Sequence, residues 1–257
     1  MSESSSVHAA ARAFDRAGED YDRGRPGYPS EAVDWLADAL RLGTGRTVLD
    51  LAAGTGKFTR LLVPTGARVL AVEPADGMRV RLESALPDVV ALAGTAEAIP
   101  VGAGAVDAVV VAQAFHWFDG EAALAEVHRV LVPGGRLGLI WNGRDDSNAW
   151  VAGLTELMEP YRGGAPRYFG DVWRAAFERT ELFTPLRHGQ FALVHELDAD
   201  GVVARVTSVS FIAALSENER AEIVEHVRSL LATHPETRGR TTFGLPYCTD
   251  VFWCERV

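Results

Sequence analysis

Two acidic side chains and a run of small residues could form a ligand site. Asp50 ends a short apolar run, and the loop Ala52-Ala53-Gly54-Thr55-Gly56 comes directly afterwards. Glu73 and Pro74 follow the next apolar run. Glycine allows a loop to bring backbone amides close to a ligand, and carboxylates accept hydrogen bonds from hydroxyl and ammonium groups. These residue types predict a site at which a ligand contacts the backbone of the loop.

Two classes of ligand compete for this loop, a dinucleotide and S-adenosylmethionine. A dinucleotide loop needs a third glycine in the first helical turn, where this chain has Phe58 and Thr59. Asp50 would also face a diphosphate unfavourably, whereas an acid suits an ammonium and sulfonium ligand without phosphate. The local charges therefore favour S-adenosylmethionine. We expect Ala52 to have a negative φ, at which its methyl group does not block the ligand.

Apolar strands alternate with amphipathic helices through the first half of the chain. The predicted strands are 48–51, 68–72, 89–93, 107–111 and 137–141, and the predicted helices are 56–63, 76–85 and 120–131, with a Pro133-Gly134-Gly135 turn closing the last helix. This alternation predicts a doubly wound, mostly parallel α/β sheet with helices on both faces. Ligands of such sheets bind at the carboxyl ends of the strands, where Asp50 and Glu73 stand.

The flanking regions predict a covering segment and a lid. A helix is expected over 9–22, and Ser30 is expected to cap a second helix that reaches Leu42. After residue 142, helices are expected over 149–158, 170–178, 198–206 and 216–232, with strands over 186–196 and 241–256. We therefore divide the chain into an N-terminal segment (1–30), a cofactor-binding core (31–142) and a C-terminal half that completes the sheet and carries helical lid insertions (143–257).

Composition narrows the classes of partner. The net charge of −10 disfavours nucleic acid, which binds to positively charged surfaces. No apolar run is long enough for a membrane span, and the N-terminus lacks the apolar segment of a secretory signal. Cys248 and Cys254 have no neighbouring metal-ligand motif, so we expect reduced thiols, no metal site and a cytoplasmic protein. A monomer or a homodimer is expected.

Five motifs, in order over roughly residues 45–142, resemble those of class I S-adenosylmethionine-dependent methyltransferases. They are Asp50-Leu51-Ala52-Ala53-Gly54-Thr55-Gly56, Glu73, Gly94-Thr95-Ala96-Glu97-Ala98-Ile99-Pro100, Asp107-Ala108-Val109-Val110-Val111 and Leu131-Val132-Pro133-Gly134-Gly135. Residues 21–29 and 113–118 further resemble a small-molecule subgroup related to the ubiquinone-biosynthesis (type 11) and trans-aconitate enzymes. The resemblance implies a seven-stranded Rossmann-like sheet and methyl transfer from S-adenosylmethionine to a small molecule.

The resemblance also implies roles for cofactor-side residues. Glu73 would accept the ribose hydroxyls, the Thr95 side chain and Ala96 amide would contact adenine, and Glu97 would hold that loop. Asp50 would bind near the methionine part or would cap the loop, and both interpretations remain open. The set of residues expected at the cofactor is Tyr21, Arg25, Asp50, Ala52, Gly54, Gly56, Glu73, Pro74, Thr95, Ala96, Glu97, Gln113 and Ala114. Two of them depart from the family pattern, since Ala52 usually is glycine and Thr95 usually is aspartate.

Candidate acceptor-side residues follow the fourth and fifth strands. His116 would act as a general base, or would be a structural histidine bonded to a loop carbonyl. Trp117 would contact the acceptor or pack in the core, and Trp141, Asn142 and Arg144 would line the acceptor pocket. The aromatic residues of the lid would pack together or would form an apolar acceptor pocket: Tyr161, Tyr168, Phe169 and Trp173.

These observations predict an enzyme that transfers a methyl group by SN2 displacement to a small-molecule acceptor. Product S-adenosylhomocysteine would leave the same site. Three alternatives stay open: a cofactor-binding regulator without catalysis, an enzyme that uses the sulfonium for other chemistry, and an NAD-dependent oxidoreductase. The last is disfavoured by Thr59 and Asp50. The N-terminal Tyr21 and Arg25 would cover the methionine part and pair with a carboxylate, or would lie on a solvated surface.

Overall fold

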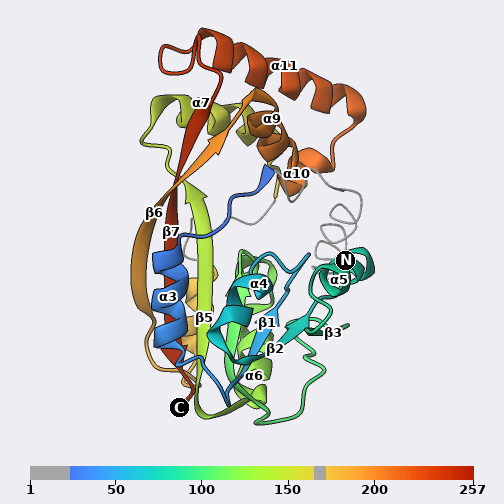
Figure 1. Ribbon diagram of the computed structural model, residues 1–257, viewed down its shortest axis with the longest axis vertical. Helices are drawn as coiled ribbons and strands as arrows, with labels where there is room; N and C mark the ends of the chain where they lie inside the picture. The colour runs from blue at the N-terminus through green and yellow to red at the C-terminus, as the bar shows by residue number, and fades with distance from the viewer. Residues whose placement is uncertain (1–23, 165–171) are drawn as a thin grey trace. The chain divides into compact units, whose positions relative to one another are not determined.

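A computed structural model describes residues 24–164 and 172–257. It contains one sheet of seven strands in the order β3-β2-β1-β4-β5-β7-β6 (Figure 1). The strands are β1 (Thr47–Leu51), β2 (Arg68–Val72), β3 (Val90–Leu92), β4 (Val106–Ala112), β5 (Leu131–Arg144), β6 (Arg187–Leu197) and β7 (Phe243–Glu255). The pairs β1–β2, β2–β3, β1–β4 and β4–β5 are parallel. The predicted doubly wound, mostly parallel sheet is confirmed.

The chain divides into two compact units. The first unit contains residues 1–26, 143–165 and 192–248, and the second contains 27–142, 166–191 and 249–257. Each of the long strands β5, β6 and β7 has residues in both units. The second unit includes the loop after β1 and every described residue that we expect at the cofactor except Arg25.

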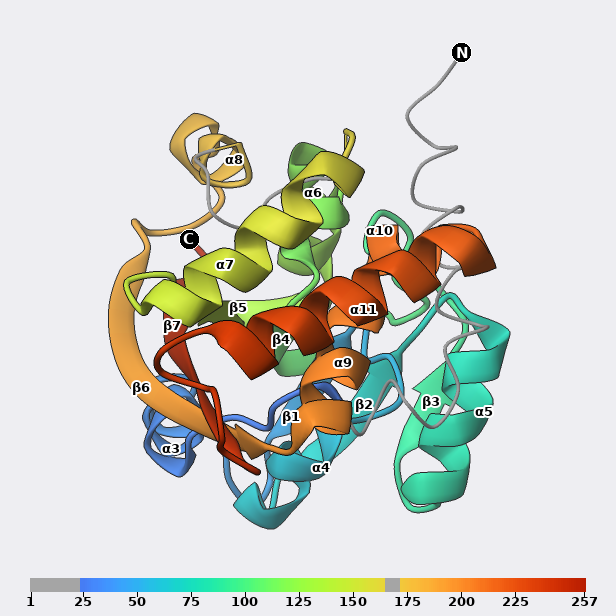
Figure 2. The ribbon, with the colours of Figure 1, turned by 90° about the horizontal axis from the view of Figure 1, so that it is seen from above.

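Helices cover both faces of the sheet in the second unit. On one face the buried side chains come from α3 (Ser30–Ala39), α4 (Thr59–Leu62) and α5 (Asp76–Ala85). On the other face they come from α6 (Gly120–Val130) and α8 (Arg174–Arg179). Figure 2 shows α3 and α4 on one side of strands β1, β4 and β5, and α6 on the other. Because both faces are covered, β1 and β4 are apolar almost throughout rather than alternating with polar residues.

The first unit has a separate core. It is built from α7 (Ala149–Met158), α9 (Ala199–Thr207), α10 (Ser210–Ala213) and α11 (Glu217–Thr233), together with part of β7. Helix α11 packs against both α7 and α9. Ser216 begins α11 with a capping box, since its side chain accepts from the Glu219 amide while the Glu219 carboxylate accepts from the Ser216 amide.

Several predicted helix bounds differ from the structure. The helix predicted over 56–63 starts only at Thr59, because Gly56 has a left-handed φ of +83°, and it ends at Leu62. The helix predicted over 170–178 is α8, which starts at Arg174. Helix α3 starts at Ser30 but ends at Ala39, and the residue before its first turn is Pro29. The Ser30 hydroxyl donates to the Glu31 carboxylate at 3.1 Å and does not cap the helix. The predicted helix over 9–22 lies outside the described residues. The short helix α10 was not predicted, because only four residues form it.

The Pro133-Gly134-Gly135 segment belongs to β5 rather than to a free turn. The strand starts at Leu131, and its pairing with β4 shifts register, so that Val106 pairs with Leu131 and Ala108 with Arg136. The extra residues are accommodated because Gly134 has a φ of +70°. A Cβ atom on Gly135 would lie 2.8 Å from the Val132 carbonyl oxygen, so this position also requires glycine.

No helix of the described residues is long and apolar enough to cross a membrane. Their side chains also form no group of three or more His, Cys, Asp or Glu that could hold a metal ion.

Candidate cofactor site at the carboxyl ends of β1, β2 and β4

Asp50 is a fully buried acid at the end of β1. Its Oδ2 accepts a hydrogen bond from the Thr59 hydroxyl at 2.6 Å. Its Oδ1 is buried and accepts no hydrogen bond from the residues that the structure describes. Burial raises the pKa of Asp50 to about 7; the Thr59 bond lowers it and the negative charge of Glu73 raises it further. Asp50 is therefore poised to ionise when a positive charge comes close.

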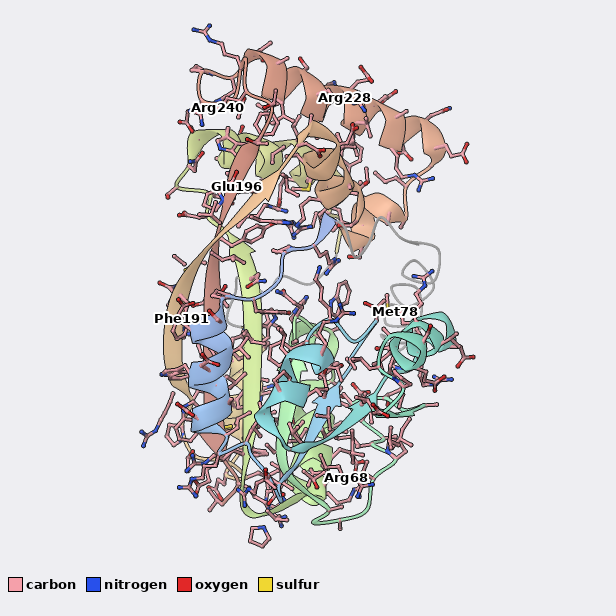
Figure 3. The ribbon with its side chains drawn as sticks, in the orientation of Figure 1. Arg68, Met78, Phe191, Glu196, Arg228 and Arg240 are labelled. Carbon is pink, nitrogen blue, oxygen red and sulfur yellow. The ribbon has the colours of Figure 1, made fainter. Side chains whose placement is uncertain are left out.

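The loop after β1 contains three residues in the left-handed backbone region. Gly54 and Gly56 have φ values of +59° and +83°, and Ala52 has a φ of +60°. The expectation of a negative φ at Ala52 is therefore wrong, and the methyl group stands at a position that favours glycine. A Cβ atom on Gly56 would come within 3.0 Å of Leu82, whereas the nearest atom to one on Gly54 would be the Met78 sulfur at 3.8 Å (Met78 is labelled in Figure 3).

Glu73 holds this loop against the end of β2. Its Oε2 accepts from the Gly54 amide at 2.8 Å and its Oε1 accepts from the Ala75 amide at 2.8 Å. The side chain is buried, and the exposed Pro74 stands between Glu73 and Ala75. Each carboxylate oxygen can accept more than one hydrogen bond, so a ribose would share Glu73 with the loop amides.

The loop at 94–100 lies after β3 and is tightly folded. Thr95 and Ala98 form an isolated bridge, Ala96 is buried, and the Glu97 carboxylate accepts from the Asp119 amide at 3.1 Å. Glu97 thus fixes the loop to the start of α6, as expected of a residue that holds the loop. A Cβ atom on Gly94 would come within 2.5 Å of Pro100, so only glycine allows this closure.

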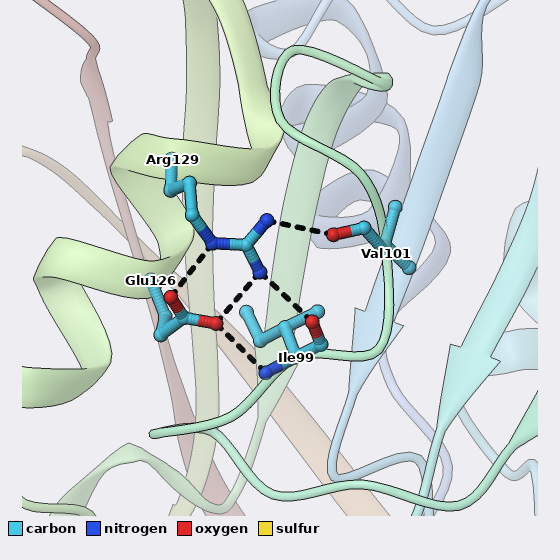
Figure 4. Close-up of polar contacts among 4 residues, drawn as sticks. All are labelled: Ile99, Val101, Glu126 and Arg129. Carbon is cyan, nitrogen blue, oxygen red and sulfur yellow. Dashed lines mark hydrogen bonds and ion pairs between the residues drawn. The ribbon is translucent and has the colours of Figure 1, made fainter.

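An ion pair on α6 fastens the end of the same loop (Figure 4). The Arg129 guanidinium donates to the Val101 carbonyl at 2.8 Å, to the Ile99 carbonyl at 2.8 Å and to both oxygens of Glu126 at 2.7 Å. Glu126 in turn accepts from the Ile99 amide at 2.9 Å. The bond from Arg129 lowers the pKa of Glu126, which keeps the pair ionised. We call Glu126 and Arg129 the α6 clamp.

The end of β4 carries a second non-glycine residue with a positive φ. Gln113 has a φ of +61°, and its amide donates to the Ile140 carbonyl on β5 at 2.9 Å. The short 3₁₀ helix Phe115–Trp117 follows Ala114. Strained backbone of this kind concentrates at functional sites, and here it turns the chain at the edge where β1 and β4 end.

His116 is oriented by a buried tryptophan. The Trp141 indole N–H donates to His116 Nδ1 at 3.2 Å. Trp141 is fully buried and packs on Trp173, with ring centroids 4.7 Å apart. Since Nδ1 accepts this bond, the neutral imidazole carries its proton on Nε2. Trp117 is half-buried beside His116, with ring centroids 5.4 Å apart.

Asn142 ties three segments of the second unit together. Its Nδ2 donates to the Gly27 carbonyl at 2.7 Å, and its Oδ1 accepts from the Thr249 hydroxyl at 2.7 Å. Arg25 belongs to the first unit, where its Nη2 donates to the Ser208 carbonyl at 3.1 Å. Tyr21, Tyr168 and Phe169 lie outside the described residues.

Among the predicted cofactor-side residues, Glu73 bonds to the Gly54 amide and its charge acts on Asp50, while the Gln113 amide bonds to Ile140 on β5. Sequence reasoning missed the Thr59 bond to Asp50, the α6 clamp and the Trp141–His116 bond. A signal was available only for the clamp, because Glu126 and Arg129 have the i, i+3 spacing of a helical ion pair. The positive φ values of Ala52 and Gln113 gave no such signal, because neither residue type favours that region.

Known proteins share both the sequence and the fold. The family model described as a methyltransferase domain matches residues 49–139. An uncharacterized methyltransferase of Mycobacterium tuberculosis is 44% identical over 229 residues, which cover 89% of each chain. An uncharacterized methyltransferase-like protein of Schizosaccharomyces pombe is 34% identical over 92% of this chain and 93% of its own. The solved structure of a putative type II methyltransferase from Anaeromyxobacter dehalogenans has a TM-score of 0.63 at 23% identity and covers 90% of this chain and 97% of its own.

Proposed function

Because the chain belongs to the methyltransferase family, we propose that it transfers a methyl group from S-adenosylmethionine to a small-molecule acceptor. The observation that carries the cofactor assignment is the Asp50–Glu73 network around the loop after β1. Glu73 accepts from the Gly54 amide, and the buried Asp50 keeps one oxygen without a hydrogen-bond donor among the described residues. Two acids at this edge suit a cationic ligand that carries hydroxyl groups.

The charges of the site argue for S-adenosylmethionine over a dinucleotide. The pKa of Asp50 is raised mainly by burial and further by the charge of Glu73, so the ionised carboxylate is stabilised by a nearby positive charge and destabilised by a diphosphate. The ammonium and sulfonium of S-adenosylmethionine supply that charge, and ionised Asp50 would balance it. The left-handed turn through Ala52, Gly54 and Gly56 brings the loop backbone to the ligand.

Each remaining cofactor-side residue has a role in this proposal. Glu73 would accept the ribose hydroxyls while it holds the loop. Thr95 and Ala96 would contact the adenine, and the α6 clamp together with Glu97 would keep that loop in place. Gln113 and Ala114 would lie along the methionine part through their backbone.

When bound, S-adenosylmethionine supplies an electrophilic methyl group on a good leaving group. The protein then contributes alignment and exclusion of water. His116 would meet the acceptor through Nε2, because Trp141 occupies Nδ1. In the neutral tautomer Nε2 donates a hydrogen bond, so His116 suits an acceptor oxygen that must be positioned. It would act as a base only in the opposite tautomer, which breaks the Trp141 bond.

The proposal includes a cytoplasmic location, a small-molecule acceptor and no binding to nucleic acid. It is supported by Cys248 and Cys254, which are not joined in a disulfide, and by the net charge of −10. A monomer or a homodimer is consistent with this proposal. A cofactor-binding regulator, which the catalytic assay below distinguishes, and an enzyme that uses the sulfonium for other chemistry are the alternatives.

Substitution of Glu73 tests the cofactor assignment. Glu73→Ala should weaken S-adenosylhomocysteine binding by about 1–3 kcal/mol in calorimetric titration, because the ribose hydroxyls lose their acceptor. Glu83→Ala is the matched control, since Glu83 is exposed on α5 and should bind like the unmodified protein. Equal affinity in both variants would remove Glu73 from the site.

Incubation with methyl-labelled S-adenosylmethionine and fractionated metabolite extracts tests the catalytic claim. Transfer of label to a low-molecular-weight product supports a methyltransferase with a small-molecule acceptor. Binding of the cofactor without transfer to any fraction would favour the regulator.

A further inference from the structure

The first unit contains two arginines, Arg144 and Arg205, that each have a buried nitrogen without a hydrogen-bond acceptor among the residues that the structure describes. Arg144 is the last residue of β5 and is only partly exposed. Its Nε is buried without an acceptor, and its guanidinium makes no hydrogen bond or ion pair with residues 24–164 or 172–257. Buried polar groups in folded proteins almost always have partners, so this guanidinium requires an explanation.

A second arginine belongs to the same cluster. The Asp145 amide donates to the Pro246 carbonyl at 3.0 Å, so Arg144 and Tyr247 flank this bond on two neighbouring strands, and Tyr247 bonds to Arg205. Arg205 lies on α9 and its Nε donates to the Tyr247 hydroxyl at 2.8 Å. Its Nη1 is buried and has no acceptor among the described residues. Helix α9 is fixed here by the chain at Gly24, where a Cβ atom would come within 2.8 Å of the Arg205 backbone nitrogen.

Tyr247 provides a third donor at the same place. Its ring is buried, and its oxygen accepts from Arg205. The hydroxyl proton therefore remains available to donate, and no described residue accepts it. Two guanidinium groups and one hydroxyl thus present donors that no residue of 24–164 or 172–257 accepts.

The charges of this cluster are not balanced locally. Burial lowers the pKa of Arg144 to about 10, and the positive charge of Arg205 is the second largest cause of this decrease. Arg162 lowers it further, although the Glu159 carboxylate binds Arg162 at 2.9 Å. The negative charge of Asp146 raises the pKa of Arg144, but the Asp146 carboxylate already accepts a hydrogen bond from the Thr155 hydroxyl at 2.9 Å. An excess of positive charge in a protein of net charge −10 marks a place for an anion.

We propose that Arg144, Arg205 and Tyr247 form a binding site for the oxyanion group of a small molecule, either a carboxylate or a phosphate. Guanidinium groups bind both anions through paired N–H donors, and a tyrosine hydroxyl adds a neutral donor. The site lies within the first unit and is built from β5, α9 and β7. The further claim that this oxyanion group belongs to the methyl acceptor rests on the proposed function. The claim that the site binds an anion does not.

Thermal unfolding with small anions tests the site. Succinate and inorganic phosphate are compared with chloride at equal ionic strength, so that general screening is subtracted. A saturable rise in Tm of a few degrees with succinate or with phosphate is expected. A rise with succinate alone identifies a carboxylate ligand, and a rise with phosphate alone identifies a phosphate ligand. Equal curves in all three salts would overturn the proposal.

Substitutions of Arg144 and Arg205 test whether the anion binds at this cluster. Arg144→Met and Arg205→Met should each weaken anion binding at least about tenfold, because charge-assisted bonds are lost. Arg228→Met is the control, because Arg228 is an exposed residue of α11 in the same unit that pairs with Asp200 (Figure 3). Anion binding that persists in both cluster variants, or that is lost equally in the control, contradicts the assignment.

The thermal stability of the Arg144→Met variant in the absence of succinate and phosphate distinguishes a ligand-binding role of Arg144 from a structural role. Arg144→Met removes a guanidinium that bonds to no described residue, so its Tm in chloride should equal or exceed that of the unmodified protein. A lower Tm would show that Arg144 serves folding and would contradict a binding role. Titration with S-adenosylhomocysteine should be unaffected by Arg144→Met, so a failure here is distinguishable from a failure of the cofactor assignment.

Discussion

Ala52 is the residue whose type fits its backbone least. It has a φ of +60° in the loop that we assign to the cofactor. Replacing it with glycine should relieve about 1 kcal/mol of strain, partly offset by the greater freedom of glycine in the unfolded chain. Ala52→Gly is therefore expected to stabilise the protein by up to about 1 kcal/mol in urea unfolding.

Arg41 is the matched control for this substitution. It also has a positive φ, of +55°, but it is exposed after the end of α3. Arg41→Gly should change stability by a similar amount and should leave S-adenosylhomocysteine affinity unchanged. Destabilisation by Ala52→Gly would mean that the alanine methyl group makes packing contacts that outweigh its backbone strain.

Asp50 makes stability depend on pH in a direction that can be worked out. The pKa of Asp50 is about 7 in the folded protein against an ordinary value of 3.8, so between these two pH values the folded state holds a proton that the unfolded state has lost. Stability contributed by Asp50 therefore falls as pH rises from about 4 to 7 and is constant above. Asp50→Asn, which cannot ionise, should gain stability relative to the unmodified protein by several kcal/mol across that range.

Urea unfolding at pH 4.5, 6.0 and 7.5 measures this difference. The Asp50→Asn variant and the unmodified protein are compared at each pH, so that other titrating groups cancel. A difference in stability that does not change with pH would contradict a buried Asp50 with a raised pKa.

At the scale of secondary-structure elements, the α6 clamp fixes the loop at 94–100 to helix α6. Arg129→Met removes the hydrogen-bond donors to the Ile99 and Val101 carbonyls, whereas the hydrogen bond from the Ile99 amide to the Glu126 carboxylate remains. The loop at 94–100 should become less ordered, so S-adenosylhomocysteine should bind about tenfold more weakly, since a fixed loop loses less entropy on binding.

Arg179→Met is the control for this variant. Arg179 pairs with Glu121 at the start of α6, but both side chains are mostly exposed. Hydrogen exchange of the Ala96 and Ala98 amides should rise in Arg129→Met and not in Arg179→Met. Unchanged exchange and affinity in Arg129→Met would show that Gly94, Pro100 and Glu97 suffice to hold the loop.

The elements were predictable where periodicity was strong. The β1, β2 and β4 strands are short apolar runs with clear breaks, and each was predicted within one residue of its ends. The end of α3 was not, because nothing in the sequence between Ala39 and Leu42 marks a stop. The register shift in β5 could not be predicted either, because it depends on how β5 pairs with β4, and the sequence of β5 alone does not specify that pairing.

In the candidate site, too, some features could be predicted from the sequence and others could not. The acids and glycines of the loop after β1 could be predicted, because their chemistry follows from residue type and order. The partner of Asp50 could not, because Thr59 reaches it only after α4 folds back on the strand. The oxyanion cluster could not either, since Arg144, Arg205 and Tyr247 are far apart in the sequence and meet only in the folded first unit.

The whole molecule combines two compact units that share the long strands β5, β6 and β7. The second unit contains the residues matched by the family model and the loop that we assign to the cofactor. The first unit contains most of the residues after 142 and the proposed oxyanion site. We infer that cofactor chemistry depends on the second unit, whereas the class of ligand beyond the cofactor is determined largely by the first.

Calorimetric titration of the full chain with S-adenosylhomocysteine and, separately, with NAD tests the central claim most directly. The Asp50–Glu73 network predicts saturable heat with S-adenosylhomocysteine at one site per chain and no heat with NAD. Saturable heat with NAD and none with S-adenosylhomocysteine would contradict the account.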